Sequence, residues 1–115
     1  MPDNLLSGVP IIESPFYERL SAGWDETTRG VGDALRRDGY AVIDFPEPDL
    51  ERLIGEIVSD LGPRYEWDDW RKSGWARKES LRIQDAWEFN DNVRRLAANR
   101  DILKLLSTLY GREAF

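Results

Sequence analysis

His and Cys, the side chains used most often for catalysis and metal binding, are both missing from this sequence. Without imidazole or thiol there is no Ser-His pair, no Cys nucleophile and no metal site that contains His. Carboxylates remain, and Glu66, Asp68 and Asp69 form the densest group in the middle of the chain. Such a group could hold a metal ion or share a proton in hydrolysis. The spacing lacks the Gly turn and the distal Glu of a calcium loop, and adjacent side chains point apart in regular structure, so we expect neither.

The carboxylates lie in a stretch, residues 64–80, that is rich in tryptophan and has no regular period. Trp67, Trp70 and Trp75 alternate there with charged residues of both signs. Two interpretations stay open. The rings could form a lid or wall over a pocket for a small-molecule substrate, where large aromatic side chains supply contact area. They could instead fold onto the body of the protein as part of a surface loop, which is the commoner situation.

Length, charge and hydropathy limit the classes of function. The chain has 115 residues, of which 41% are hydrophobic, so it is the size of one domain with a modest core. Its net charge of −6 argues against a nucleic-acid partner and against an anionic membrane, because both need excess Lys and Arg. No apolar run approaches membrane-spanning length, and no basic leader opens the sequence. With no Cys for disulfides, we expect a cytoplasmic protein.

The hydrophobic pattern predicts an α+β fold organised around one buried strand. Residues 39–45 are a short apolar run with aromatic and β-branched side chains, opened by a Gly and followed by a Pro. Residues 81–87 alternate between two sets of side chains and are predicted to form a second strand. A lone strand cannot satisfy its own edges, so we expect a larger sheet than these 115 residues can build.

One helix is predicted before the first strand and one after it. The first covers residues 25–38, with Asp25 as its N-cap, and its glycines, Gly32 among them, indicate close packing. The second covers residues 49–61, where a continuous apolar stripe lies opposite charged side chains. Gly62 is predicted to end it in the left-handed conformation.

The two ends of the chain show weaker signals. Residues 1–24 mix prolines with apolar side chains and are predicted to form an arm that lies on the body, with a short helical turn at 15–20. Asn90 and Asn99 are predicted N-caps of two further helices. We therefore expect residues 1–115 to form a single, partial domain, with residues 25–115 as a scaffold that follows the arm.

The order of these motifs resembles the N-terminal part of the phytanoyl-CoA dioxygenase family, over about residues 25–115. After the first helix come, in order, Gly39-Tyr40-Ala41-Val42-Ile43, Pro48-Asp49-Leu50, the Trp-rich stretch, Arg82-Ile83-Gln84-Asp85, and a last helix that ends in Leu109-Tyr110-Gly111. This family consists of iron(II)- and 2-oxoglutarate-dependent oxygenases built on a double-stranded β-helix. The resemblance implies that this chain is the helix-rich N-terminal part of such a fold, with the barrel incomplete and the remainder of the domain as its partner.

The resemblance also implies an activity for the parent protein, the hydroxylation of a small organic substrate with decarboxylation of 2-oxoglutarate. In the family, the His-x-Asp pair, the distal His and the Arg that binds 2-oxoglutarate all follow the point that matches Phe115. We therefore expect the isolated chain to bind no iron(II) and to be inactive. A basic residue, usually Lys, often opens the family's strand at the position of Arg82, so Arg82 and Gln84 are the expected contacts to 2-oxoglutarate. Trp67, Trp70 and Trp75 would shape the substrate mouth.

Two alternatives stay open beside this interpretation. Arg82 could be a surface residue on an edge strand rather than a cosubstrate ligand. The whole chain could also be a complete, small α+β module for binding or assembly that has no catalytic activity, which explains the missing His directly. Such a module would fold cooperatively by itself.

Overall fold

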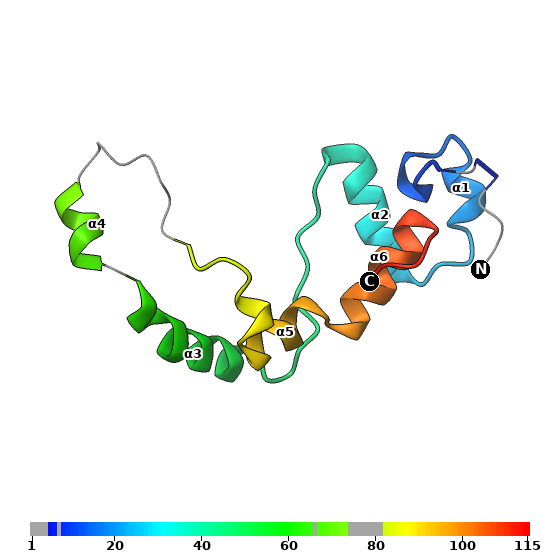
Figure 1. The fold of residues 1–115 in the computed structure, drawn as a ribbon. Helices are drawn as coiled ribbons and strands as arrows, with labels where there is room; N and C mark the ends of the chain where they lie inside the picture. Colours follow the sequence, from blue (N-terminus) through cyan, green and yellow to red (C-terminus); the bar gives the residue numbers. More distant parts are fainter. Residues whose placement is uncertain (1–4, 7, 66, 74–81) are drawn as a thin grey trace. The chain divides into compact units, whose positions relative to one another are not determined.

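The computed structural model of the chain describes residues 5–6, 8–65, 67–73 and 82–115, and these residues form helices joined by loops (Figure 1). The elements are η1 (Ile11–Glu13), α1 (Tyr17–Leu20), α2 (Glu26–Asp38), α3 (Leu50–Leu61), η2 (Gly62–Arg64), α4 (Trp67–Ser73), η4 (Ala86–Glu88), α5 (Asp91–Ala97) and α6 (Arg100–Tyr110). They belong to two compact units, the first made of Met1–Pro46 with Asn99–Phe115 and the second of Glu47–Ala98. No helix in the described ranges is long and apolar enough to cross a membrane.

The predicted α+β fold is wrong, because the part of the chain that the structure describes contains no strand and therefore no part of a sheet or barrel. Residues 40–45 follow α2 in an extended course (Figure 1) but pair with no neighbour among the described residues. Residues 82–85 turn instead of continuing, since Asp85 adopts a left-handed φ of 53° directly before η4. β-Branched and aromatic side chains favour extended backbone, but a strand also needs a neighbour for its hydrogen bonds, and neither segment has one.

The predicted helix caps of the first unit are confirmed. The Asp25 carboxylate accepts a hydrogen bond of 2.7 Å from the Thr28 amide and starts α2. The Asn99 side chain accepts from the amides of the first turn of α6. Gly39 and Gly111 end these two helices in the left-handed conformation, with φ of 81° and 72°.

The helices of the second unit agree with the sequence less fully. The helix predicted over residues 49–61 is α3, and Asn90 caps α5 as predicted. Gly62 is not left-handed, because its φ of −51° carries the chain into the 3-10 turn η2, where Pro63 fits. Helix α4 lies in the stretch predicted to lack regular structure. Two turns are too short to show a hydrophobic period, which explains why the pattern missed this helix.

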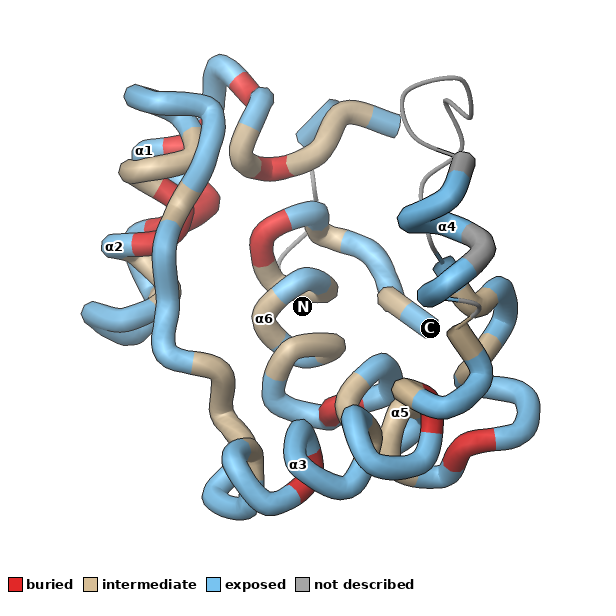
Figure 2. The backbone as a smooth tube through the Cα atoms, turned by 90° about the vertical axis from the view of Figure 1, so that its left-hand side faces the viewer, coloured by how far each residue is buried: buried red, intermediate tan, exposed pale blue. Residues whose placement is uncertain are grey.

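The core of the first unit forms around Tyr17 of α1, which is almost completely buried. Figure 2 shows buried residues on both α1 and α2. Ile11 and Leu20 complete this buried cluster, and Trp24 packs against it. The Tyr17 hydroxyl donates a hydrogen bond of 2.7 Å to the Asp33 carboxylate on α2. The apolar residues of the predicted arm thus provide the buried cluster of this unit.

The second unit is held by packing of α3 and by ion pairs. Leu53 and Leu61 are the buried residues of α3. The Arg95 guanidinium of α5 lies 2.5 Å from a carboxylate oxygen of Glu47 and 3.3 Å from one of Asp49, just before α3 begins. The Glu47 side chain is nearly buried, so this pair is shielded from solvent on one side and fixes the start of α3 against α5.

Candidate functional site

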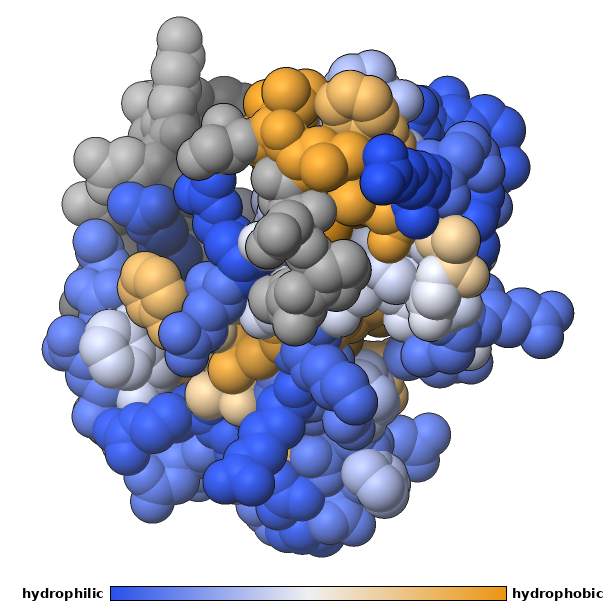
Figure 3. All heavy atoms as spheres, turned by 90° about the vertical axis from the view of Figure 1, so that its right-hand side faces the viewer, coloured by the Kyte–Doolittle hydropathy of each residue, from blue (hydrophilic) through white to orange (hydrophobic). Residues whose placement is uncertain are grey.

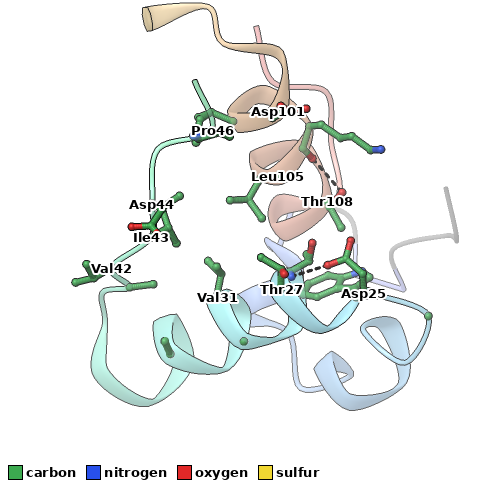
Figure 4. Close-up of a pocket in the computed structure, with 18 residues that line it drawn as sticks. Asp25, Thr27, Val31, Val42, Ile43, Asp44, Pro46, Asp101, Leu105 and Thr108 are labelled. Carbon is green, nitrogen blue, oxygen red and sulfur yellow. Dashed lines mark hydrogen bonds between the residues drawn. The ribbon is translucent and has the colours of Figure 1, made fainter. Parts of the chain in front are cut away.

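The described residues of the first unit enclose a pocket of about 810 Å³ (Figure 4). Its walls come from the α2 helix with the turn before it, from the extended segment 41–46 and from α6. This volume lies within the range of pockets that bind small ligands or side chains of a partner. The lining residues are Gly23, Trp24, Asp25, Thr27, Thr28, Gly30, Val31, Ala34, Ala41, Val42, Ile43, Asp44, Pro46, Asp101, Ile102, Lys104, Leu105 and Thr108.

Apolar side chains from three segments converge on the pocket. Figure 4 shows Val31 of α2 and Leu105 of α6 reaching toward the extended segment that carries Ile43. The sequence places them there because Val31 lies on the apolar face of α2 and Leu105 on that of α6. Ile43 nevertheless keeps 40% of its surface exposed, so the three segments meet without closing the space between them.

The charged groups of the lining are mostly acidic. The described lining residues include three carboxylates, Asp25, Asp44 and Asp101, and one basic side chain, Lys104. Hydrogen bonds from the Thr28 backbone and hydroxyl hold the pKa of Asp25 below its usual value, and the positive charge of Lys104 contributes in the same direction. Asp25 therefore stays ionised, and the pocket favours a cationic over an anionic ligand.

The backbone of the extended wall is unusual because its hydrogen-bonding groups are unused. Within the described chain, no amide or carbonyl of residues 40–45 makes a hydrogen bond. The Val42 side chain is 89% exposed and that of Tyr40 is 66% exposed, so this side of the segment faces solvent. The nearest fixed point is the Pro46 carbonyl, which accepts a hydrogen bond of 3.1 Å from the Asn99 side chain.

Those predicted site residues that the structure describes lie outside this pocket. Arg82 and Gln84 are exposed and belong to the second unit, in the turn before η4. Trp67 and Trp70 lie on α4, each 45% exposed, and the Trp67 indole donates a hydrogen bond of 3.3 Å to the Gly62 carbonyl. Trp75 lies outside the described residues. Arg82, Gln84, Trp67 and Trp70 do not line this pocket, so their roles remain predictions.

The residues of this chain do not fit the iron site that the resemblance implies. A facial triad needs two imidazoles and a carboxylate, and the sequence contains no His. The described residues also contain no cluster of three acidic side chains placed to hold a metal ion.

The pocket itself could not be found from the sequence, because none of its apolar members carries chemistry. The one signal in the sequence is the apolar run of residues 39–45, whose composition instead predicts a buried strand. A comparison of the chain with protein-family models, with curated proteins and with solved structures finds no match. The family resemblance therefore continues as a proposal based on the motifs quoted above.

Proposed function

We propose that this chain is the N-terminal, non-catalytic scaffold of an iron(II)- and 2-oxoglutarate-dependent oxygenase similar to the phytanoyl-CoA dioxygenase family. The ordered motifs between residues 25 and 115 support this proposal, with Arg82 and Gln84 in the segment that would contact 2-oxoglutarate. The observation that carries it is apolar surface left without cover. Ile54 and Val58 lie one turn apart on α3 and are 47% and 64% exposed.

Uncovered apolar surface of this kind is what a scaffold needs if further protein packs on it. Burial of apolar surface yields about 25 cal/mol per Å², so an exposed row of Ile and Val is a favourable docking surface. Leu106 and Tyr110, likewise one turn apart, are 38% and 41% exposed on α6 of the other unit. Apolar side chains also reach the surface in patches on the face shown in Figure 3. Both units therefore leave apolar residues that additional protein could cover.

The division of roles follows from the side chains that the sequence holds. The imidazoles that bind iron would come from residues outside 1–115, since this stretch has no His. The chain would supply helices that brace the catalytic part, and Trp67, Trp70 and Trp75 would border the entrance for a small organic substrate. Bound iron would activate O₂ with 2-oxoglutarate in the parent protein.

The coding sequence beyond Phe115 tests this proposal directly. We expect a His-x-Asp motif within a few dozen codons and a distal His later on. The complete product should then bind iron(II) and convert 2-oxoglutarate to succinate, whereas residues 1–115 alone should not. A stop codon directly after Phe115, or succinate formation by residues 1–115 alone, would contradict the proposal.

A second candidate function is a small helical module that binds a partner without catalysis, and the pocket of the first unit favours it. The space of about 810 Å³, with apolar walls and three acidic side chains in its lining, is a binding feature that needs no metal. This candidate predicts that residues 1–115 alone unfold cooperatively in urea and stay monodisperse. A broad, non-cooperative transition or aggregation at micromolar concentration would argue against it.

A further inference from the structure

We propose that the first unit binds an extended, basic peptide segment of a partner protein, which lies along residues 40–45 and inserts apolar side chains into the pocket. This inference deepens the second candidate function and does not depend on oxygenase chemistry. Two features meet at the same place, an extended backbone with unused hydrogen-bonding groups and an apolar pocket directly beside it. Neither feature alone defines a ligand, but together they match the way in which a peptide adds as a strand.

The backbone of residues 40–45 supplies the general part of the affinity. In extended backbone, successive amides point to opposite edges, so either edge presents a donor and an acceptor at every second residue. None of these groups is used within the described chain. A net gain of about 1 kcal/mol per hydrogen bond formed is typical, so a few such bonds give weak but measurable affinity.

The pocket supplies the preference for apolar side chains. In a strand that lies along residues 40–45, side chains alternate between two faces, and those on one face would point toward α2 and α6. Figure 4 shows Leu105 and Val31 facing the extended segment across the pocket. Side chains of valine or isoleucine size would cover the exposed part of Ile43 and fill this space.

The charges of the pocket lining determine whether a basic or an acidic peptide is preferred. Asp25, Asp44 and Asp101 outnumber Lys104 among the described lining residues, which gives this surface a net negative charge. A peptide with lysine at the positions between its apolar residues would place cations near these carboxylates while the apolar side chains enter the pocket. An acidic peptide of the same length would be repelled.

Backbone pairing is tested with three synthetic peptides and the complete chain of residues 1–115. The first is a hexapeptide of alternating lysine and valine, and the other two carry N-methyl groups on its odd or its even amides. Binding is followed by two-dimensional ¹H–¹⁵N NMR at the amides of residues 40–45. We expect the first peptide to bind, and at least one methylated peptide to bind about tenfold more weakly, because methylation removes donors from one edge.

Two variants on adjacent positions of α6 test where the peptide lies. Leu105 lines the pocket, whereas Leu106 does not and is 38% exposed. Leu105→Gln should lower the affinity of the chain for the first peptide about tenfold, whereas Leu106→Gln should leave that affinity unchanged. If Leu105→Gln disturbs the fold in far-UV circular dichroism, Ala34→Leu, which fills the pocket from α2, replaces it.

The outcomes separate this inference from the two candidate functions. Absence of binding up to about 1 mM, or equal binding of all three peptides, overturns the strand-like mode. If the first peptide binds the pocket variant and Leu106→Gln with equal affinity, the pocket is not the binding site. Either result leaves the oxygenase proposal to its own test beyond Phe115, and cooperative unfolding of the chain would still support a binding module with another ligand.

Discussion

Gly32 on α2 gives the sharpest test of how the first unit is packed. A Cβ atom added at Gly32 would lie 2.5 Å from the Tyr17 hydroxyl and 2.9 Å from the Trp24 ring. A Cβ at Gly30, two residues earlier on the same helix, would meet nothing within 4 Å. The two glycines therefore form a matched pair in which only one substitution produces a collision.

Tyr17 cannot easily move away from the added methyl group. The guanidinium groups of Arg29 and Arg36 both pack over its ring, 5.2 Å and 4.5 Å from the ring centroid. The Tyr17 hydroxyl donates a hydrogen bond to Asp33. The Trp24 ring packs edge-on against the Tyr17 ring, with 5.7 Å between the ring centroids. The side chain is also almost completely buried, so any displacement disturbs several contacts at once.

The expected magnitudes follow from two opposing effects. Replacing Gly by Ala inside a helix normally stabilises a protein by about 1 kcal/mol, and both variants receive this gain. Overfilling a packed core costs about 1–3 kcal/mol, and only Gly32→Ala incurs that cost. We therefore expect Gly32→Ala to have a free energy of unfolding about 1–3 kcal/mol below that of Gly30→Ala.

Urea denaturation followed by far-UV circular dichroism measures this difference. Tyr17→Phe in the Gly32→Ala background provides a second check, because it removes the oxygen that collides most closely with the new methyl group. The coupling between the two substitutions should be favourable. If Gly32→Ala is as stable as Gly30→Ala, the packing of Tyr17 against α2 described here is incorrect.

Three further predictions concern buried polar groups of the first unit. Burial, followed by the hydrogen bond to Asp33, raises the pKa of Tyr17 to about 12, so its neutral form is favoured in the fold. The resulting stability is complete below pH 10 and is lost toward pH 12, so the native chain should lose about 1–3 kcal/mol more over this range than Tyr17→Phe does. Asn99→Ala should lower the free energy of unfolding by about 1–2 kcal/mol, and Asn99→Asp by less, because Asp keeps the cap and loses only the donation to the Pro46 carbonyl. Ser21→Ala should raise the free energy of unfolding by about 1 kcal/mol, since the Ser21 hydroxyl is buried and has no partner among the described atoms. A lower free energy of unfolding would mean that this hydroxyl does make a hydrogen bond in the native protein.

The sequence predicted helices and their caps well because those signals are local. Asp25, Asn90 and Asn99 each bond to amides two or three residues ahead, so the pattern that predicts the cap also contains its partner. The end of α6 at Gly111 follows from the same kind of local rule. These elements were confirmed without any knowledge of tertiary contacts.

The strands were predicted wrongly because pairing is not a local property. Residues 39–45 have the composition of a strand, but whether they become one depends on a neighbour that composition cannot show. The alternation of residues 81–87 fails for a different reason, since Asp85 takes a left-handed conformation that strand propensity does not anticipate. Pockets are harder still, because Val31 and Leu105 look like ordinary core residues until the space between them is known.

The hydrogen bond between the Asn99 side chain and the Pro46 carbonyl has a consequence for how this chain could change in length. Residues 47–98 leave the first unit at one end of this bond and return at the other. The segment 47–98 thus starts and ends at two residues, Pro46 and Asn99, that are hydrogen-bonded to each other. A longer, shorter or different segment in place of residues 47–98 leaves the distance between Pro46 and Asn99 unchanged. This segment is therefore a natural place for grafting and for evolutionary insertion or deletion.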